Sequence, residues 1–174
     1  FGISSEEAAE IAAQSKSDGV CLVPAFNGLG APWWDSRALG LISGLTLNTD
    51  KGALFAAAVE SIAHQVADVV DAMNASGVEV QRLLLDGGPS RNAKLREMLS
   101  AYIAKPVVHC SDAELSALGV AHLAGVGAGI WDWDAIAKLQ RAQTATDVSE
   151  RNAATKPERQ RWAHAVAQSR LARQ

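Results

Sequence analysis

The stretch Leu83-Leu84-Leu85-Asp86-Gly87-Gly88-Pro89-Ser90-Arg91-Asn92 leads from a short apolar run through two glycines into a helical pattern. The run over 82–86 predicts a buried strand, and the pattern over 92–103 predicts a helix. In open α/β sheets, ligands bind beyond the carboxyl ends of the strands. Glycine lets the backbone approach a ligand there, and a helix N-terminus offers unpaired N–H groups. This turn is therefore a candidate ligand site, in which Asn92 can hydrogen-bond a base or ribose; alternatively, Asn92 only starts the helix, with its side chain in water.

Strand and helix patterns alternate on both sides of this turn, which indicates an α/β fold with partly parallel strands. The predicted strands cover 20–25, 39–45, 82–86 and 106–109. The predicted helices cover 5 to 14 or 16, 51–75, 92–103 and 111–126, with a short helix from 132 or 134 and a last helix from about 157. Two pairs, Ser4 with Glu7 and Ser111 with Glu114, have the spacing of capping boxes. The polar segment 143–156 is expected to be an exposed connection.

The composition is that of an ordinary globular protein, with 48% hydrophobic residues and a mean hydropathy of +0.02. No uninterrupted apolar run approaches the roughly 20 residues of a spanning helix, so we expect no membrane association. Residues 1–150 carry 10 Lys/Arg and 18 Asp/Glu, whereas 151–174 carry six and one. We expect this basic tail to be a helix that packs on the acidic body; an anionic partner is the alternative. Basic blocks with interleaved aromatic residues are absent, which argues against nucleic acid as a partner.

Other chemistry-bearing residues have weak patterns. Two cysteines, Cys21 and Cys110, are too few for a disulfide scaffold and are expected in the core. The four histidines lack metal-ligand spacing, and His64, four residues from both Glu60 and Asp68, is expected to pair with them on the surface. The sequence has no GxxxxGK[ST] phosphate loop. The adjacent Trp33 and Trp34 are expected to pack under a loop, with stacking on a substrate as the alternative.

Four motifs follow one another in a fixed order: 23–35 (Val-Pro-Ala-Phe-Asn-Gly-Leu-Gly-Ala-Pro-Trp-Trp-Asp), 40–46 with 60–63, 86–88 with Asn92, and 117–121 (Ala-Leu-Gly-Val-Ala). Together they resemble the C-terminal domain of the FGGY-family carbohydrate kinases, and the first is similar to the glycerol kinase branch of that family. The resemblance covers about 20–134, and the tail beyond it does not match well. Leu39 and Ala53 differ from the residues that are usual at these positions of the family's signatures. These differences concern the identity of the substrate more than membership in the family.

The resemblance implies a ribonuclease-H-like, actin-type ATPase domain with a mixed sheet and flanking helices. It implies that Gly88 and Asn92 contact the adenosine part of ATP while Gly87 shapes the turn. In the family, an Asp of the N-terminal lobe is the base that positions the acceptor hydroxyl, and Mg²⁺ offsets the negative charge of the phosphates. The resemblance puts these groups mainly outside this chain, so no catalytic residue and no metal ligand is assigned here. The chain starts at Phe1 without Met or a leader, and we expect an upstream part to be missing.

The sequence therefore predicts an FGGY nucleotide-binding domain over 1–150, incomplete at its N-terminus, and a basic helix over 151–174. The expected function is phosphoryl transfer from ATP to glycerol or a similar polyol by the whole protein, in the cytoplasm. The expected partners are ATP or ADP and a small polyol or sugar, and a homo-oligomer is left open. Two alternatives keep the same motifs: a non-catalytic nucleotide-binding or regulatory module, and a kinase for a pentulose or longer polyol. By itself this chain is expected to be inactive.

Overall fold

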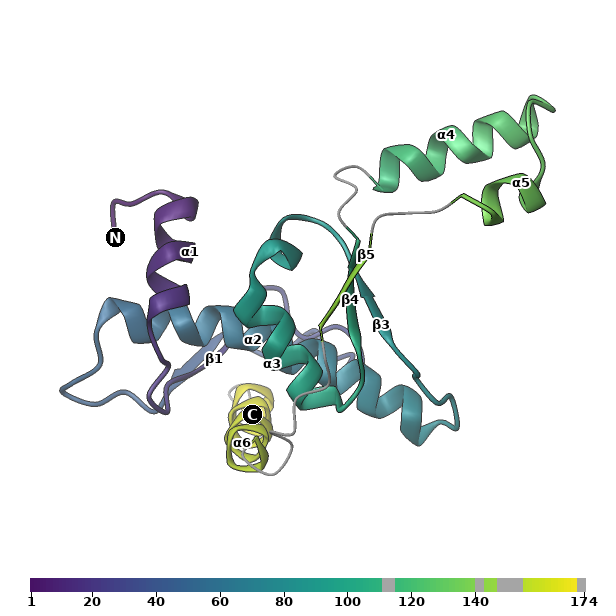
Figure 1. Ribbon diagram of the computed structural model, residues 1–174. Helices are drawn as coiled ribbons and strands as arrows, with labels where there is room; N and C mark the ends of the chain where they lie inside the picture. The colour runs from purple at the N-terminus through teal and green to yellow at the C-terminus, as the bar shows by residue number, and fades with distance from the viewer. Residues whose placement is uncertain (111–114, 140–142, 147–154, 172–174) are drawn as a thin grey trace.

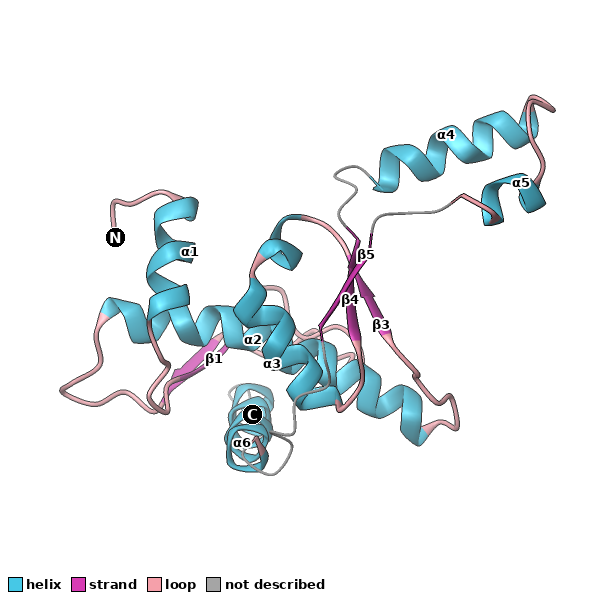
Figure 2. Ribbon diagram, in the orientation of Figure 1, coloured by secondary structure: helices cyan, strands magenta, loops and turns pink. Residues whose placement is uncertain are grey.

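The computed structural model describes residues 1–110, 115–139, 143–146 and 155–171, with main chain only for 143–146. Helices and strands alternate through most of this length (Figures 1 and 2). The elements are α1 (Ser5–Gln14), β1 (Cys21–Val23), β2 (Leu41–Ser43), α2 (Lys51–Ala75), β3 (Leu83–Leu85), the 3-10 helix η1 (Gly88–Arg91), α3 (Ala93–Ile103), β4 (Val107–Cys110), α4 (Leu115–Gly127), α5 (Trp133–Ala137), β5 (Gln143–Thr146) and α6 (Lys156–Leu171).

The described strands form two sheets. One is the antiparallel pair β1–β2, in which Leu22 lies opposite Ile42. The other has the order β3-β4-β5, with β3 and β4 parallel and β4 and β5 antiparallel. A parallel pair needs a crossover connection, which α3 supplies here. The expectation of a mixed sheet with flanking helices is thus confirmed.

One strand, β5, contradicts the sequence-based prediction. Its residues fall within the segment that was expected to be an exposed connection. The run Gln143-Thr144-Ala145-Thr146 has no apolar alternation, and its main chain pairs with β4 alone in the described sheet. Because edge strands need not bury a hydrophobic face, composition gives little sign of them. The rest of the predicted connection, at 147–154, lies outside the described residues.

Side-chain caps begin several of the helices. The Ser4 hydroxyl accepts a hydrogen bond from the Glu7 N–H at 3.1 Å, as the capping-box spacing predicts. The Asp50 carboxylate accepts from the Ala53 N–H at 2.8 Å and begins α2. The second predicted capping box, Ser111 with Glu114, lies outside the described residues.

The long helix α2 is the central element of the core. By length and composition it could cross a membrane, but half of its most apolar window is buried inside this protein. It packs against α1, α3 and β1. Ala63, Ala67 and Val70 are buried with residues from α3 and β4, so α2 is the core helix of a folded domain. The apolar side chains of α2 are only partly buried. Ile62 and Met73 are exposed, while alanines occupy the most buried positions.

The last helix, α6, packs over β1 and the loop that follows it. Trp162, Ala165 and Val166 join a buried cluster with residues of β1 and this loop, such as Val23 and Leu29. Trp162 is 1% exposed and is among the largest fully buried side chains of the described chain. Burial of one such side chain contributes about 1.5–3 kcal/mol, so apolar burial is a large part of what holds α6 in place. An ion pair between Arg170 and Asp35 lies toward its C-terminal end.

The face of α2 that carries His64 and Asp68 is buried, so the predicted surface pairing of His64 is wrong. The Asp68 carboxylate accepts from Trp33 Nε1 at 3.1 Å, Trp162 Nε1 at 2.7 Å and Arg159 Nη2 at 2.7 Å. The His64 ring stacks on the rings of Tyr102 and Trp162. Because α6 covers this face, the two polar residues take partners from across the molecule instead of from their own helix.

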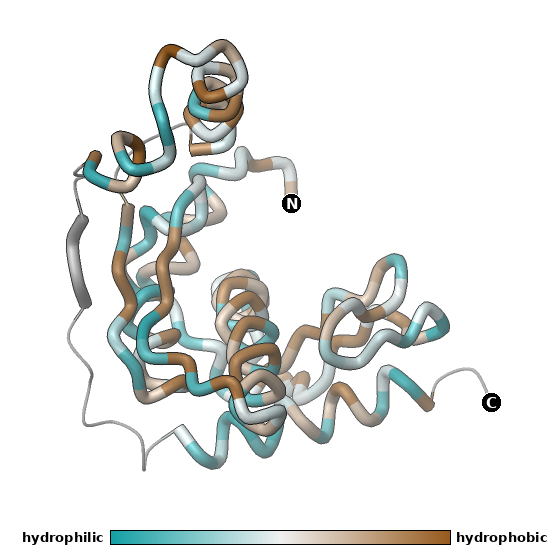
Figure 3. Tube along the Cα trace, turned by 90° about the vertical axis from the view of Figure 1, so that its right-hand side faces the viewer, coloured by the Kyte–Doolittle hydropathy of each residue, from teal (hydrophilic) through white to brown (hydrophobic). Residues whose placement is uncertain are grey.

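A smaller unit formed by α4 and α5 lies beyond the end of the β3-β4-β5 sheet, away from α1 and α2 (Figures 1 and 3). Trp131, in the connection between the two helices, packs back on α4, since its indole Nε1–H donates to the His122 carbonyl at 3.1 Å. Gly125 lies inside α4, where the Trp131 ring occupies the space a Cβ would need. Glycine at this position therefore serves packing.

Candidate functional site

The predicted glycine turn forms one edge of a groove of about 790 Å³. The strands β3 and β4 carry hydrophobic residues (brown in Figure 3), and β3 delivers the chain to the turn at its carboxyl end. The turn continues through η1, and three further elements complete the groove: the first turns of α3, one face of α1, and the middle of α2. Its lining comprises Ala9, Glu10, Ala13, Val59, Ile62, Gly88, Pro89, Arg91, Asn92, Ala93, Lys94, Leu95 and Glu97.

The two glycines differ in what they do for the turn. Gly87 has φ 80° and ψ 178°, a conformation that is open almost only to glycine. Gly88 has no positive φ, and a Cβ added there would meet no atom within 4 Å. Gly88 lines the groove, whereas Gly87 does not. Gly87 therefore sets the path of the chain, and Gly88 leaves open space at the groove edge.

Hydrogen bonds from inside the chain hold the turn. The buried Ser90 hydroxyl donates to the Gly87 carbonyl at 2.6 Å, and the Asn92 N–H donates to the Pro89 carbonyl at 3.1 Å. Arg96, one turn into α3, donates from Nη1 to the Ser90 carbonyl at 2.6 Å. With its carbonyls bound in this way, the turn presents a preformed edge to the groove.

Asn92 begins α3, and its side chain has one polar group left over for a second role. Its side-chain oxygen accepts from the Leu95 N–H at 3.2 Å, so it is the N-cap of α3. With the oxygen used in this way, the amide nitrogen is the group that is left to donate. No acceptor for it is found within the described parts of the chain, and the residue lines the groove. Asn92 can therefore cap the helix and donate to a ligand at the same time.

The opposite walls were missed by sequence reasoning. Ala9 and Ala13 lie on one face of α1, four residues apart, and Val59 and Ile62 lie on one face of α2. Small residues at i and i+4 on α1 were the available signal, and they read equally well as ordinary helix packing. Ile62 is 39% exposed. These four side chains give the groove apolar walls suited to a flat ring.

The remaining candidates fall outside this groove. The Trp33 ring packs beside the cluster under α6 and bonds Asp68, as expected for a structural residue, while Trp34 is 78% exposed. Cys21 and Cys110 are free and buried, as predicted, and burial raises the pKa of the Cys21 thiol to about 11. Over the described ranges, no three His, Cys, Asp or Glu side chains gather in a way that could hold a metal ion.

Solved structures with the same architecture are kinases of sugars and polyols. Plasmodium falciparum glycerol kinase with ADP superposes with a TM-score of 0.79 at 31% identity, over 95% of this chain and 34% of that one. Xylulose kinase from Lactobacillus acidophilus gives a TM-score of 0.75 over 98% of this chain and 35% of that one; at 20% identity, it shows the fold alone. The fold is therefore the actin-type ATPase fold of this class of kinases, as the sequence predicted.

The sequence comparisons identify the family. Residues 3–128 match the C-terminal domain of the FGGY family of carbohydrate kinases. Glycerol kinase from Rhodopirellula baltica is 40% identical over 96% of this chain and 32% of its own length. Glycerol kinase from Streptococcus pyogenes is 43% identical over 73% of this chain and 26% of its own. The chain belongs to the FGGY family of carbohydrate kinases, of which it carries the C-terminal domain.

The matches also show how much of each chain is shared. The chain spans about a third or less of the length of these curated relatives. The match to the Rhodopirellula protein covers nearly the whole chain, including most of the tail that was set outside the resemblance. The match to the family's C-terminal domain, by contrast, ends at residue 128, before the tail.

Proposed function

We propose that this chain is the nucleotide-binding part of an ATP-dependent carbohydrate kinase, and that its groove takes the adenosine part of ATP or ADP. The observation that carries the proposal is the groove edge, where Gly88 leaves open space and Asn92 presents an amide donor at the end of β3. The apolar walls from α1 and α2 suit a purine ring, and the Asn92 amide suits the polar edge of that ring or the ribose. One solved relative of the same fold is described with ADP.

The reaction proposed for the whole protein is phosphoryl transfer from ATP to a hydroxyl of glycerol or a similar small polyol. Glycerol is favoured because the two curated relatives at 40–43% identity are glycerol kinases. In this proposal the chain binds and orients the nucleotide, which is most of what phosphoryl transfer asks of a protein. Mg²⁺ would offset phosphate charge when bound; its ligands and the base that receives the hydroxyl proton are proposed to lie outside this chain. We also propose a cytoplasmic location, which suits two buried free thiols.

The nucleotide site is tested by separating the two roles of Asn92. Asn92→Ser keeps a capping oxygen and the net charge but removes the amide donor, whereas Asn92→Ala removes both. We expect Asn92→Ser to raise the Kd for ADP about 2- to 12-fold, the equivalent of one hydrogen bond, with an unchanged melting temperature. Asn92→Ala should weaken binding similarly and also lose about 1 kcal/mol of stability with the cap. Calorimetric titration with ADP that gives one Kd for all three proteins would remove Asn92 from the site.

The activity is tested on the intact protein with ATP and a set of acceptors. Glycerol, erythritol, xylitol and pentuloses should each be assayed for acceptor-dependent ADP formation, with glycerol expected to give the highest kcat/KM. A preference for a pentulose would favour the second candidate, a ketose kinase. ADP binding without turnover on any acceptor would favour a non-catalytic nucleotide-binding module.

A further inference from the structure

One lysine next to the groove bonds a helix about 80 residues away in the sequence. Lys94 lies in the first turn of α3, two residues after Asn92, and it lines the groove. Its ammonium group donates to the carbonyl of Ser15 and, at 3.4 Å, to the carbonyl of Ala12. Both carbonyls belong to the C-terminal end of α1, and Ser15 is its C-cap. A single side chain therefore joins the two elements that face each other across the groove.

The chemistry of a helix end explains why a lysine suits this place. The last carbonyls of a helix have no partner within the helix, and they carry the negative end of its dipole. The last turn of α1 has no basic residue of its own, while its first turn has Glu6 and Glu7. Lys94 brings the missing positive charge from another helix, and an ammonium group has three donors with which to satisfy two carbonyls.

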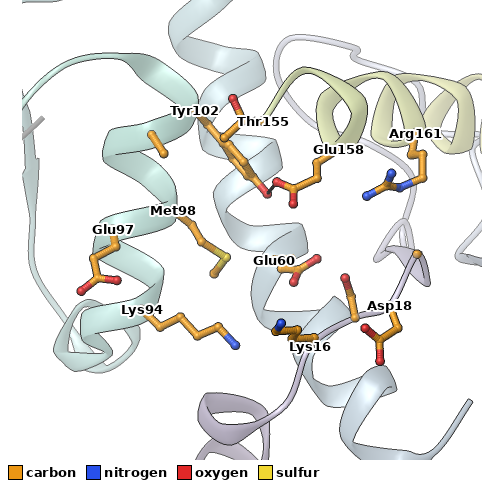
Figure 4. A pocket seen from close by; sticks show the side chains of 13 residues that line it. Lys16, Asp18, Glu60, Lys94, Glu97, Met98, Tyr102, Thr155, Glu158 and Arg161 are labelled. Atoms are coloured by element: carbon orange, nitrogen blue, oxygen red, sulfur yellow. Dashed lines mark hydrogen bonds between the residues drawn. The ribbon is translucent and has the colours of Figure 1, made fainter. Parts of the chain in front are cut away.

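The lysine lies between two hollows of the molecule. Lys94 lines both the groove and a second cavity of about 800 Å³ between α2, α3 and α6. Figure 4 shows the Lys94 chain extending from α3 toward the segment that carries Lys16 and Asp18, immediately after α1. Both α1 and α3 pack on α2, and the Lys94 bridge adds a direct link between α1 and α3 beside these hollows. The other anchor of α1 is α2, where Gly52 approaches the Ser15 side chain closely.

We propose that Lys94 is a positioning residue for the nucleotide: its ammonium group holds the α1 wall, with Ala9 and Ala13, at a fixed distance from Asn92. This inference rests on the proposed function of the groove. Without the bridge, α1 keeps its contact with α2 but can move relative to the turn. The nucleotide then loses the simultaneous contact with the apolar wall and the amide donor, because a small misplacement weakens both.

The test compares three variants of the intact protein. Lys94→Met removes the ammonium group but keeps an unbranched side chain of similar length. Lys94→Arg keeps the charge and several donors. Lys16→Met is the matched control, because this substitution also removes one positive charge near the C-terminal end of α1. Unlike Lys94, Lys16 lines only the second cavity and not the groove. We expect Lys94→Met to raise the Kd for ADP and the KM for ATP on the order of tenfold, while the KM for the acceptor changes little.

The conservative variant and the control decide the interpretation. Lys94→Arg and Lys16→Met should bind ADP within about threefold of the unchanged protein, since the bridge persists in both. An unchanged Kd for Lys94→Met would overturn the inference. So would equal weakening by Lys94→Met and Lys94→Arg, because the ammonium bridge would then not be the cause.

A measurement on the unchanged protein covers the case in which Lys94→Met does not fold. Hydrogen exchange of the amides in the last turn of α1 should slow when ADP is bound, because α1 is then held from both sides. Exchange that is unaffected by saturating ADP would overturn the assignment of α1 as a wall. The proposed function fails separately: if Asn92→Ser binds ADP normally, the groove is not the nucleotide site. If Asn92→Ser is weakened and Lys94→Met is not, only the role of Lys94 is lost.

Discussion

At the residue scale, Gly87 and Gly88 are neighbours in the sequence, but their backbones make different demands. Gly87 has φ 80° at the end of β3, and Gly88 begins η1 with ordinary helical geometry. A Cβ would be sterically free at both positions within this chain. The need for glycine is therefore conformational at the first position and, in our proposal, comes from the ligand at the second.

This difference can be measured with two alanine substitutions. Gly87→Ala should lower the free energy of unfolding by about 1–3 kcal/mol, because alanine is strained at that φ. Gly88→Ala should leave the unfolding free energy nearly unchanged but weaken ADP binding, because its methyl group enters the groove. Urea unfolding and ADP titration of the same two proteins provide the check. A Gly88→Ala protein that is much less stable than Gly87→Ala would contradict this division of roles.

His64 should make stability depend on pH. Burial, with help from the nearby Arg159 and Arg161 charges, lowers the pKa of His64 to about 3. The unfolded chain protonates this histidine near pH 6.5, so it binds more protons than the folded chain between the two values. The contribution of neutral His64 to the free energy of unfolding is therefore complete above pH 6.5. It is lost as the pH drops toward 3, by up to about 1.4 kcal/mol per pH unit.

The matched variant for this effect is His64→Phe, which keeps an aromatic ring between Tyr102 and Trp162 but cannot titrate. Between pH 6.5 and 4.5 the unchanged protein should lose more unfolding free energy than the variant does. Glu60, whose pKa is raised mainly by burial, acts in the opposite direction but is present in both proteins. Parallel stability curves for the two proteins would show that His64 does not carry the pH dependence.

At the element scale, α6 is attached by one apolar side and by the buried carboxylate of Asp68, in addition to the more exposed ion pairs of Arg159 with Asp71 and of Arg170 with Asp35. Trp162 fills the cluster beside β1 and also donates to Asp68, while Arg159 donates to the same carboxylate and to Asp71. The contact with Asp71 is exposed and adds little. The buried Asp68 depends on its donors, because an uncompensated charge in the core costs several kcal/mol.

Two substitutions of Trp162 separate its packing from its hydrogen bond. Trp162→Ala should lower the unfolding free energy by about 3–5 kcal/mol, as for other large buried aromatic residues. Trp162→Phe keeps most of the ring and should cost less, about 1–3 kcal/mol for the lost donor to Asp68. Because α6 covers Cys21, Trp162→Ala should also speed the reaction of that thiol with a labelling reagent. Equal costs for the two variants would assign the whole effect to the hydrogen bond.

Local patterns predicted most of the elements. The limits 51–75 match α2, because the helix has a cap before it and Ser76-Gly77 after it. Features decided by distant residues were not predictable: β5 exists through pairing with β4, and the burial of His64 exists through α6. The same holds for the candidate site. The glycine turn and Asn92 are contiguous and were recognised, but the walls from α1 and α2 meet them only in three dimensions.

At the scale of the whole molecule, the chain has the nucleotide groove proposed here but no residue to which we assign the chemistry. It spans about a third or less of its curated relatives, and the acceptor base is proposed to lie in the remainder. We therefore expect the 174 residues by themselves to form no ADP from ATP in the presence of glycerol. A coupled assay with the intact protein as positive control checks this. Turnover by the chain alone would mean that a catalytic base lies within it.

The contacts of Asp68 also have a consequence for the time course of synthesis. Asp68 and its partner Trp162 are 94 residues apart. A ribosome adds about 5–20 residues per second, so roughly 5–20 s pass between the appearance of the two side chains. Throughout that interval the nascent chain has an apolar face on β1 and the loop after it, and a carboxylate on α2, with no helix to cover them. Chaperones would have to protect that face during translation, and a slow codon run before residue 159 would lengthen the exposure.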